Sequence, residues 1–176
     1  MPKLIAFVGG GLLGTMLGFV IGIFVYPYIF LADIVADEQL LDPDSRRVVA
    51  TGTFIHANPS DPVHYGIGGV TLYDSTQINL GTNGATRYDS VLRLESDFEV
   101  GPGPKFHVYL VPKDRVTDSA DVEGTMYIDL GRLRAFKGSQ NYPVPAGVDL
   151  KDFGSVVIWC EKFGVLISPA TLTFEG

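Results

Sequence analysis

The chain has 176 residues, of which 46% are hydrophobic and 19% are charged, and its formal net charge is −7. Its 11 Phe and 8 Tyr residues exclude an intrinsically disordered chain, because disordered chains lack bulky apolar side chains. Residues 33–176 carry 12 basic and 20 acidic side chains, a formal charge of −8. Such a surface repels a phosphate backbone, so no nucleic-acid partner is expected.

An uncharged segment lies near the N-terminus, where Asp, Glu, Lys and Arg are absent from Leu4 to Ala32. A helix over residues 4–26, ended by Pro27, would be about 35 Å long and could cross a hydrocarbon core of about 30 Å. We therefore predict a transmembrane anchor over residues 1–32 that contacts membrane lipid. The alternative is a cleaved signal peptide, whose apolar region is usually shorter.

The charges that flank this segment predict its orientation. Lys3 precedes the segment, whereas the acidic Asp33, Asp37 and Glu38 follow it. Basic residues favour the cytoplasmic side of a membrane. The N-terminus is therefore expected in the cytoplasm, and the following domain on the periplasmic or extracellular side.

Small residues recur at every fourth position inside the predicted span, at Ala6, Gly10, Gly14, Gly18 and Gly22. This spacing places them on one helix face, where a second helix can approach closely in lipid. The pattern predicts association into a homodimer or with a membrane redox partner. Glycine is also simply frequent in membrane helices, and that interpretation stays open.

After a short acidic tether over residues 33–47, the sequence changes to a period of two. Apolar and polar residues alternate from 49 to 56, 106 to 111 and 126 to 130, and residues 155–160 form a nearly continuous apolar run. Gly, Pro and Asn turn signals separate these segments. The pattern predicts an all-β domain over residues 48–176, an antiparallel β-sandwich preceded by one transmembrane helix.

Three residues are candidates for chemistry. Cys160, the single cysteine, ends the apolar run and can serve as a nucleophile, metal ligand or redox group, or simply as a small buried hydrophobe. His64 lies in a glycine-rich loop, and His107 lies in a predicted strand. Imidazole and thiolate both bind iron and copper, so these three residues are the candidate metal ligands.

Several motifs in order resemble the electron-transfer DM domain, the DM-thirteen family. They run from Val49 to Leu172. The residues that carry the resemblance are Gly52-x-Phe54, His64 with Gly68-Gly69, Leu92-x-Leu94, Gly103-Pro104, Val108-Tyr109-Leu110, Leu130-Gly131-x-Leu133, Gly138-x-Gln140-x-Tyr142-x-Val144-Pro145 and 155–163.

This resemblance implies a sandwich similar to the DOMON domains and an extracytoplasmic redox role centred on Cys160. We expect Cys160 to be the catalytic residue, with His64 and His107 binding a cofactor, either haem or a transition metal. The alternative hypothesis is a non-catalytic, membrane-tethered binding domain in which Cys160 is structural.

Overall fold

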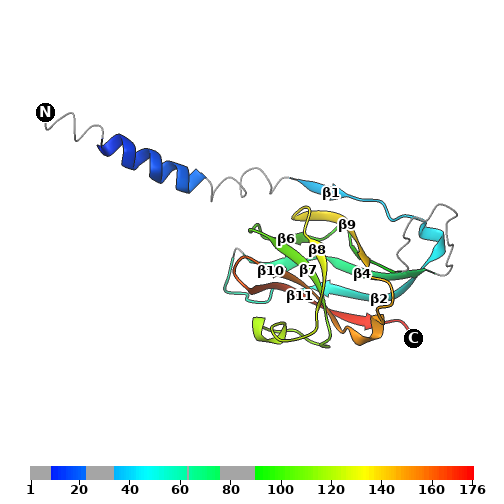
Figure 1. The fold of residues 1–176 in the computed structure, drawn as a ribbon. Coiled ribbons are helices and arrows are strands. Elements are labelled where there is room, and N and C mark those ends of the chain that lie inside the picture. Colours follow the sequence, from blue (N-terminus) through cyan, green and yellow to red (C-terminus); the bar gives the residue numbers. More distant parts are fainter. Residues whose placement is uncertain (1–8, 23–33, 63, 76–89) are drawn as a thin grey trace, which may run out of the picture.

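The computed structural model describes residues 9–22, 34–62, 64–75 and 90–176 (Figure 1). The strands are β1 (Val35–Asp37), β2 (Arg46–Phe54), β3 (Gly66–Ile67), β4 (Gly69–Ser75), β5 (Ser90–Leu94), β6 (Glu99–Val100), β7 (Phe106–Val111), β8 (Ile128–Arg132), β9 (Lys137–Val144), β10 (Ser155–Cys160) and β11 (Val165–Phe174). Short 3-10 helices are η1 (Pro43–Ser45), η2 (Ser119–Asp121) and η3 (Leu150–Asp152).

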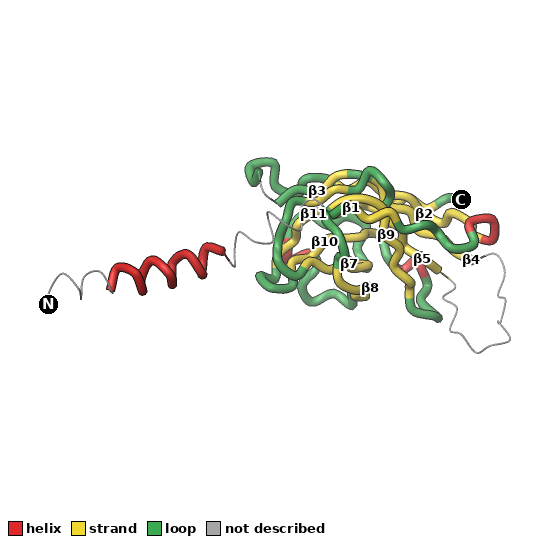
Figure 2. The backbone as a smooth tube through the Cα atoms, turned by 90° about the horizontal axis from the view of Figure 1, so that it is seen from above, coloured by secondary structure: helices red, strands yellow, loops and turns green. Residues whose placement is uncertain are grey.

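The strands form one hydrogen-bonded path in the order β3-β6-β9-β5-β4-β2-β11-β10-β7-β8. The pairings along this path are antiparallel, and β1 adds to β9 in parallel. Both views show the strands curling around a common interior rather than lying flat (Figure 2). The prediction of an all-β, mainly antiparallel domain is confirmed, and the two-layered sandwich stays a prediction.

The alternation of side chains along the strands creates two apolar clusters. The larger cluster fills the interior and draws on nearly every strand, including Phe54 of β2, Leu92 of β5, Leu110 of β7 and Ile158 of β10. A smaller cluster lies on the opposite face of β7 and β10 and contains Tyr109, Val111, Val116, Val122, Val157 and Trp159. Strands β7 and β10 are therefore covered on both faces, which explains the continuous apolar run at residues 155–160.

Residues 9–22 form a helix, on which Gly10, Gly14, Gly18 and Gly22 lie. A Cβ atom at each of these four positions would meet no other atom within 4 Å. Within the described residues, no helix reaches the length and apolar character needed to cross a membrane. The predicted span also includes residues 4–8 and 23–26, which lie outside the described residues.

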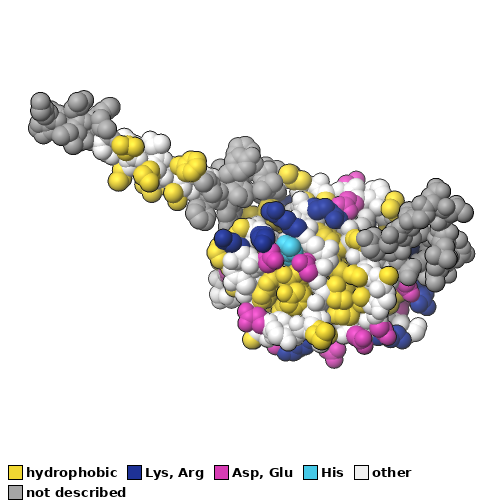
Figure 3. Space-filling model, viewed as in Figure 1, with side chains coloured by type: hydrophobic (Ala, Val, Ile, Leu, Met, Phe, Trp, Pro, Cys, Tyr) yellow, Lys and Arg dark blue, Asp and Glu magenta, His cyan; other side chains and the backbone are white. Residues whose placement is uncertain are grey.

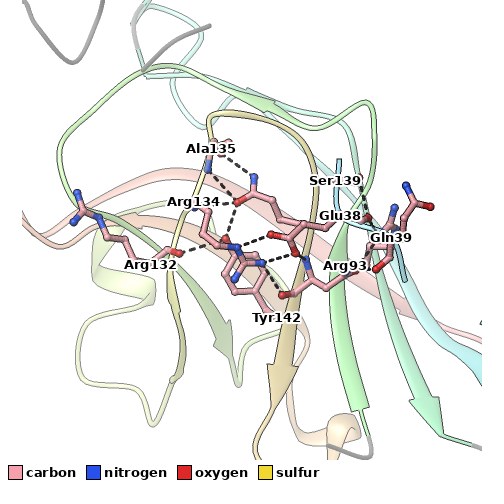
Figure 4. Close-up of polar contacts among 10 residues, drawn as sticks. Glu38, Gln39, Arg93, Arg132, Arg134, Ala135, Ser139 and Tyr142 are labelled. Carbon is pink, nitrogen blue, oxygen red and sulfur yellow. Dashed lines mark hydrogen bonds and ion pairs between the residues drawn. The ribbon is translucent and has the colours of Figure 1, made fainter. Parts of the chain in front are cut away.

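Strand β9 is a strand that the sequence pattern does not predict. Its centre carries polar side chains and Pro143, yet Ser139 and Gln140 are fully buried. The Gln140 side chain explains this burial, because it serves the turn between β8 and β9. Its Oε1 accepts from the backbone N–H groups of Arg134 and Ala135 at 3.0 and 3.2 Å, and its Nε2 donates to the Ala135 carbonyl at 2.8 Å (Figure 4).

We expect Gln140→Leu to lower the free energy of unfolding by about 2–4 kcal/mol, because buried backbone groups of the turn would lose their partners. Denaturant titration followed by Trp159 fluorescence measures this change. Gln39→Leu is the matched control, since Gln39 is exposed and its side chain donates only to the exposed Asp37. Equal stability of the two variants would contradict the role given to Gln140.

Candidate functional site

Cys160 is the last residue of β10 and belongs to the interior cluster, with 1% of its surface exposed. It pairs with Phe106 of β7 and Val165 of β11. Its Sγ donates to the carbonyl oxygen of Pro104 at 3.3 Å. The thiol therefore has a fixed direction, toward the segment that leads into β7.

The chain turns immediately after Cys160, where the N–H of Gly164 donates to the Cys160 carbonyl at 2.8 Å. Lys162 lies in this turn and is exposed. Two residues apart on a strand, Lys162 and Cys160 would share one face, but β10 ends at Cys160, so Lys162 does not lie on the strand face of the thiol.

A pocket of about 600 Å³ opens beside the segment that accepts the thiol hydrogen bond. Its lining residues are Gly103, Pro104, Lys105, Phe106, Arg132, Leu133, Arg134, Ala135 and Phe136. A side chain at Gly103 would collide with the Phe106 ring, so this position requires glycine. Pro104 belongs to both the pocket wall and the thiol contact, so Cys160 lies directly behind this wall.

Among the described residues, three cations and no acidic residue line the pocket, although the chain as a whole is acidic. Lys105 pairs with Glu161 at 2.6 Å, and this contact lowers the pKa of the Glu161 carboxyl. Arg132 is exposed and forms no salt bridge within the described part of the chain. The pocket therefore presents positive charge to an approaching molecule, and Arg132 is its least neutralised member.

Arg134 is held by the segment that precedes β2. Its guanidinium donates to both carboxylate oxygens of Glu38, at 2.7 and 2.8 Å, and lies over the Tyr142 ring at 4.5 Å (Figure 4). Glu38 Oε2 also accepts from the N–H of Asn141 at 2.8 Å. The carbonyl of Glu38 accepts from Arg93 at 2.8 Å, which ties the same residue to β5. The segment predicted as a tether thus contributes a strand and fixes one wall of the pocket.

His107 lies on β7 between Phe106 and Val108 and points to the opposite face of the sheet from them, as the period of two predicts. Its Nδ1 lies 2.9 Å from Asp129, and its Nε2 lies 3.4 Å from Glu161. Basic, acidic and histidine side chains gather beside apolar ones on one face of the molecule (Figure 3). Since Cys160 points inward, His107 and Cys160 lie on opposite faces of the sheet.

His64 lies in the loop between β2 and β3, and its side chain is 40% exposed. Its Nδ1 contacts the Asp61 carboxylate at 2.6 Å, and its backbone N–H donates to the same carboxylate at 3.1 Å. The next residue, Tyr65, accepts from Gly101 N–H through its carbonyl. The His64 loop is therefore anchored to the segment that continues to Pro104, but no contact of the described residues joins His64 to Cys160.

The three predicted site residues are thus placed apart. Among the described residues, no group of three or more His, Cys, Asp and Glu side chains is arranged to hold a metal ion. Sequence reasoning also missed Glu38, Arg132 and Arg134. Arg132 and Arg134 flank Leu133 in the motif Leu130-Gly131-x-Leu133, whose apolar residues and glycine carry the family resemblance.

Tyr65 anchors the His64 loop through a second contact, because its hydroxyl donates to Glu99 at 2.5 Å. This hydrogen bond, together with Lys137 at 3.2 Å, lowers the pKa of the Glu99 carboxyl, while burial opposes the shift. The hydrogen bond to Glu99 and burial raise the pKa of Tyr65 to about 12.

We expect Tyr65→Phe to lower the free energy of unfolding more at pH 7 than at pH 3. A carboxyl with a lowered folded-state pKa stabilises the fold above its unfolded value of about 4.3, and this contribution is lost as the pH falls through the folded-state pKa. Denaturant titrations at both pH values test this, with Tyr73→Phe as the control. An equal loss at both pH values would contradict the coupling to Glu99.

Comparison with known proteins gives a match to a family model. The family model described as Electron transfer DM13 matches residues 74–172, more than half of the chain. No curated protein and no solved structure gives a match. The matched region contains Cys160, His107 and the residues that line the pocket at Pro104. The chain therefore belongs to the Electron transfer DM13 family.

Proposed function

We propose that this protein is an electron-transfer domain in which Cys160 is the redox group and the pocket at residues 103–106 and 132–136 is the side from which a redox partner approaches. One observation carries this proposal: the thiol donates to Pro104, which lines the pocket. The family description supports the electron-transfer role.

The charge of the pocket selects the kind of partner. Lys105 and Arg134 are paired with Glu161 and Glu38, so Arg132 is the cation that attracts an anionic molecule or an acidic protein surface, whereas the acidic remainder of the domain repels it. Electron-transfer partners commonly form small, weak interfaces whose formation is steered by charge. The thiol behind the wall would then be separated from the partner by Pro104 and Phe106.

The residues present do not fit a transition metal held by Cys160, His64 and His107 together, because these side chains lie apart and His107 faces away from the interior. Haem is favoured by one observation, an apolar pocket with cations that could pair with its carboxylates. The thiol, however, is directed at the Pro104 carbonyl. We therefore favour the thiol itself over a metal or haem ligand.

A visible absorption spectrum of the purified protein, together with the reactivity of the thiol, distinguishes a haem site, a metal site, a redox thiol and a structural thiol. A Soret band would favour haem, and a thiolate–metal charge-transfer band would favour a metal. A colourless protein with a thiol that never reacts in the folded state would favour the alternative, a membrane-tethered binding domain in which Cys160 is packing. A colourless protein with a reactive thiol supports the proposal.

Alkylation tests the route to the thiol, and Cys160 is the single cysteine of the chain, so the adduct mass reports it alone. Iodoacetate is anionic, whereas iodoacetamide is neutral. If both reagents enter through the pocket, Arg132→Glu should lower the ratio of the iodoacetate rate to the iodoacetamide rate by about threefold or more at low salt.

Arg115→Glu is the matched control for this experiment, since Arg115 is exposed and lines a different pocket. Its ratio should remain that of the wild type. An equal change in both variants would indicate a general effect of net charge and would contradict entry through the pocket.

The membrane anchor over residues 1–32, the cytoplasmic N-terminus and the outward-facing sandwich domain also belong to the proposal. They rest on the uncharged segment and on the flanking charges. An anchored domain of this kind would exchange electrons with partners at the membrane surface.

The glycines at every fourth position, Gly10, Gly14, Gly18 and Gly22, which we call the glycine stripe, support association of two such helices. We expect Gly14→Ile together with Gly18→Ile to reduce crosslinking in membranes at least severalfold, because the bulky side chains would keep the two backbones apart. Leu13→Ile with Leu17→Ile is the matched control outside the stripe. Unchanged crosslinking of the glycine variant would exclude this interface.

A further inference from the structure

Three aromatic side chains lie in contact on the outer face of β7 and β10. The rings of Tyr109 and Tyr127 are stacked, with centroids 4.3 Å apart and planes 8° apart. The Tyr109 and Trp159 rings are 6.3 Å apart at 26°. Together they form a continuous row, Trp159–Tyr109–Tyr127, which we call the aromatic row.

The aromatic row begins beside the candidate redox residue and ends at the surface. Trp159 directly precedes Cys160 in β10, so only a short stretch of backbone separates the indole from the thiol. Trp159 and Tyr109 are 7% and 2% exposed, whereas Tyr127 is 43% exposed. The row thus crosses the layer of residues that covers this face of the sheet.

Buried side chains from a neighbouring segment pack against the aromatic row. Val116 and Val122, from the segment between β7 and β8, are buried against it. That segment is fixed through Asp121, which pairs with Lys113 and accepts from the N–H of Thr117. Burial raises the pKa of Tyr109 well above its usual range, and the nearby Asp129 carboxylate adds to this effect. Tyr109 therefore stays protonated in the resting protein.

We propose that the aromatic row conducts single electrons between the protein surface at Tyr127 and the Cys160 end of β10. The inference rests on the proposed electron-transfer function. Electron transfer between rings falls steeply with distance, and here each ring contacts the next. Tryptophan and tyrosine can be oxidised by one electron under conditions in which aliphatic side chains and phenylalanine cannot.

The row is oxidised by a one-electron oxidant, such as an oxidised metal centre, that acts at the Cys160 end. The oxidant removes one electron from Trp159. Tyr109 gives one electron to the indole and receives one from Tyr127, so Tyr109 ends with its phenolic proton in place. Tyr127 releases its phenolic proton to water, so the indole is restored and a tyrosyl radical remains at the surface. A soluble one-electron reductant of the enediol class then supplies one electron, and water returns the proton.

Laser photoionisation of the full chain tests the route, because Trp159 is the single tryptophan and every indole radical must form there. In the wild type, the indole radical should decay while a tyrosyl radical appears at the same rate. Tyr127→Phe and Tyr109→Phe keep the rings and their packing but remove the oxidisable group. Tyr109→Phe should reduce the rate of tyrosyl formation at least tenfold. Tyr127→Phe should instead leave the radical on the buried Tyr109, where added ascorbate removes it at least tenfold more slowly than in the wild type.

Tyr73→Phe is the matched control, since Tyr73 lies on β4, which β2 and β11 separate from β10. It should behave as the wild type, and thermal melting verifies that each variant is folded. An unchanged rate of tyrosyl formation in Tyr109→Phe, or an unchanged rate of removal by ascorbate in Tyr127→Phe, would overturn the proposal. Transfer should persist in Cys160→Ser, so loss of thiol chemistry and failure of the row give different results.

Discussion

The pocket wall depends on one set of hydrogen bonds, those that the buried amide of Gln140 makes to the turn between β8 and β9. The N–H groups of Arg134 and Ala135 donate to the Gln140 side chain, and the Ala135 carbonyl accepts from it, so the buried amide supplies both an acceptor and a donor to the turn. A buried backbone group without a partner is costly, so this turn requires such a side chain. With the turn fixed, Arg134 projects toward Glu38, and residues 132–136 form a wall of the pocket.

Side chains alternate along β10, so its last two residues, Trp159 and Cys160, lie on opposite faces of the sheet. Cys160 points into the interior and contacts the pocket wall at Pro104, whereas Trp159 points outward and contacts Tyr109. Both contacts follow from the pairing of β10 with β7, which sets Cys160 opposite Phe106 and Trp159 opposite His107. One strand end therefore adjoins an apolar pocket that carries cations on one side and an aromatic surface on the other.

The strands with a clear apolar alternation could be predicted from the sequence, because alternation records which face is buried. Strand β9 could not, since its buried side chains include Ser139 and Gln140, whose burial is possible only through tertiary hydrogen bonds. The position of Cys160 at the end of a buried strand was also predictable. The pocket was not, because Glu38 and Arg134 are 96 residues apart in the sequence and no local pattern links them.

The parallel pairing of β1 with β9 has a mechanical consequence. Val35, Ala36 and Asp37 pair with Lys137, Gly138 and Ser139, and Glu38 follows with its double contact to Arg134. Tension applied to the chain before Val35 would reach these bonds before it reached β2. A load of that kind would strip β1 from the sheet edge, release Arg134 and alter the pocket wall, while the interior cluster stayed folded.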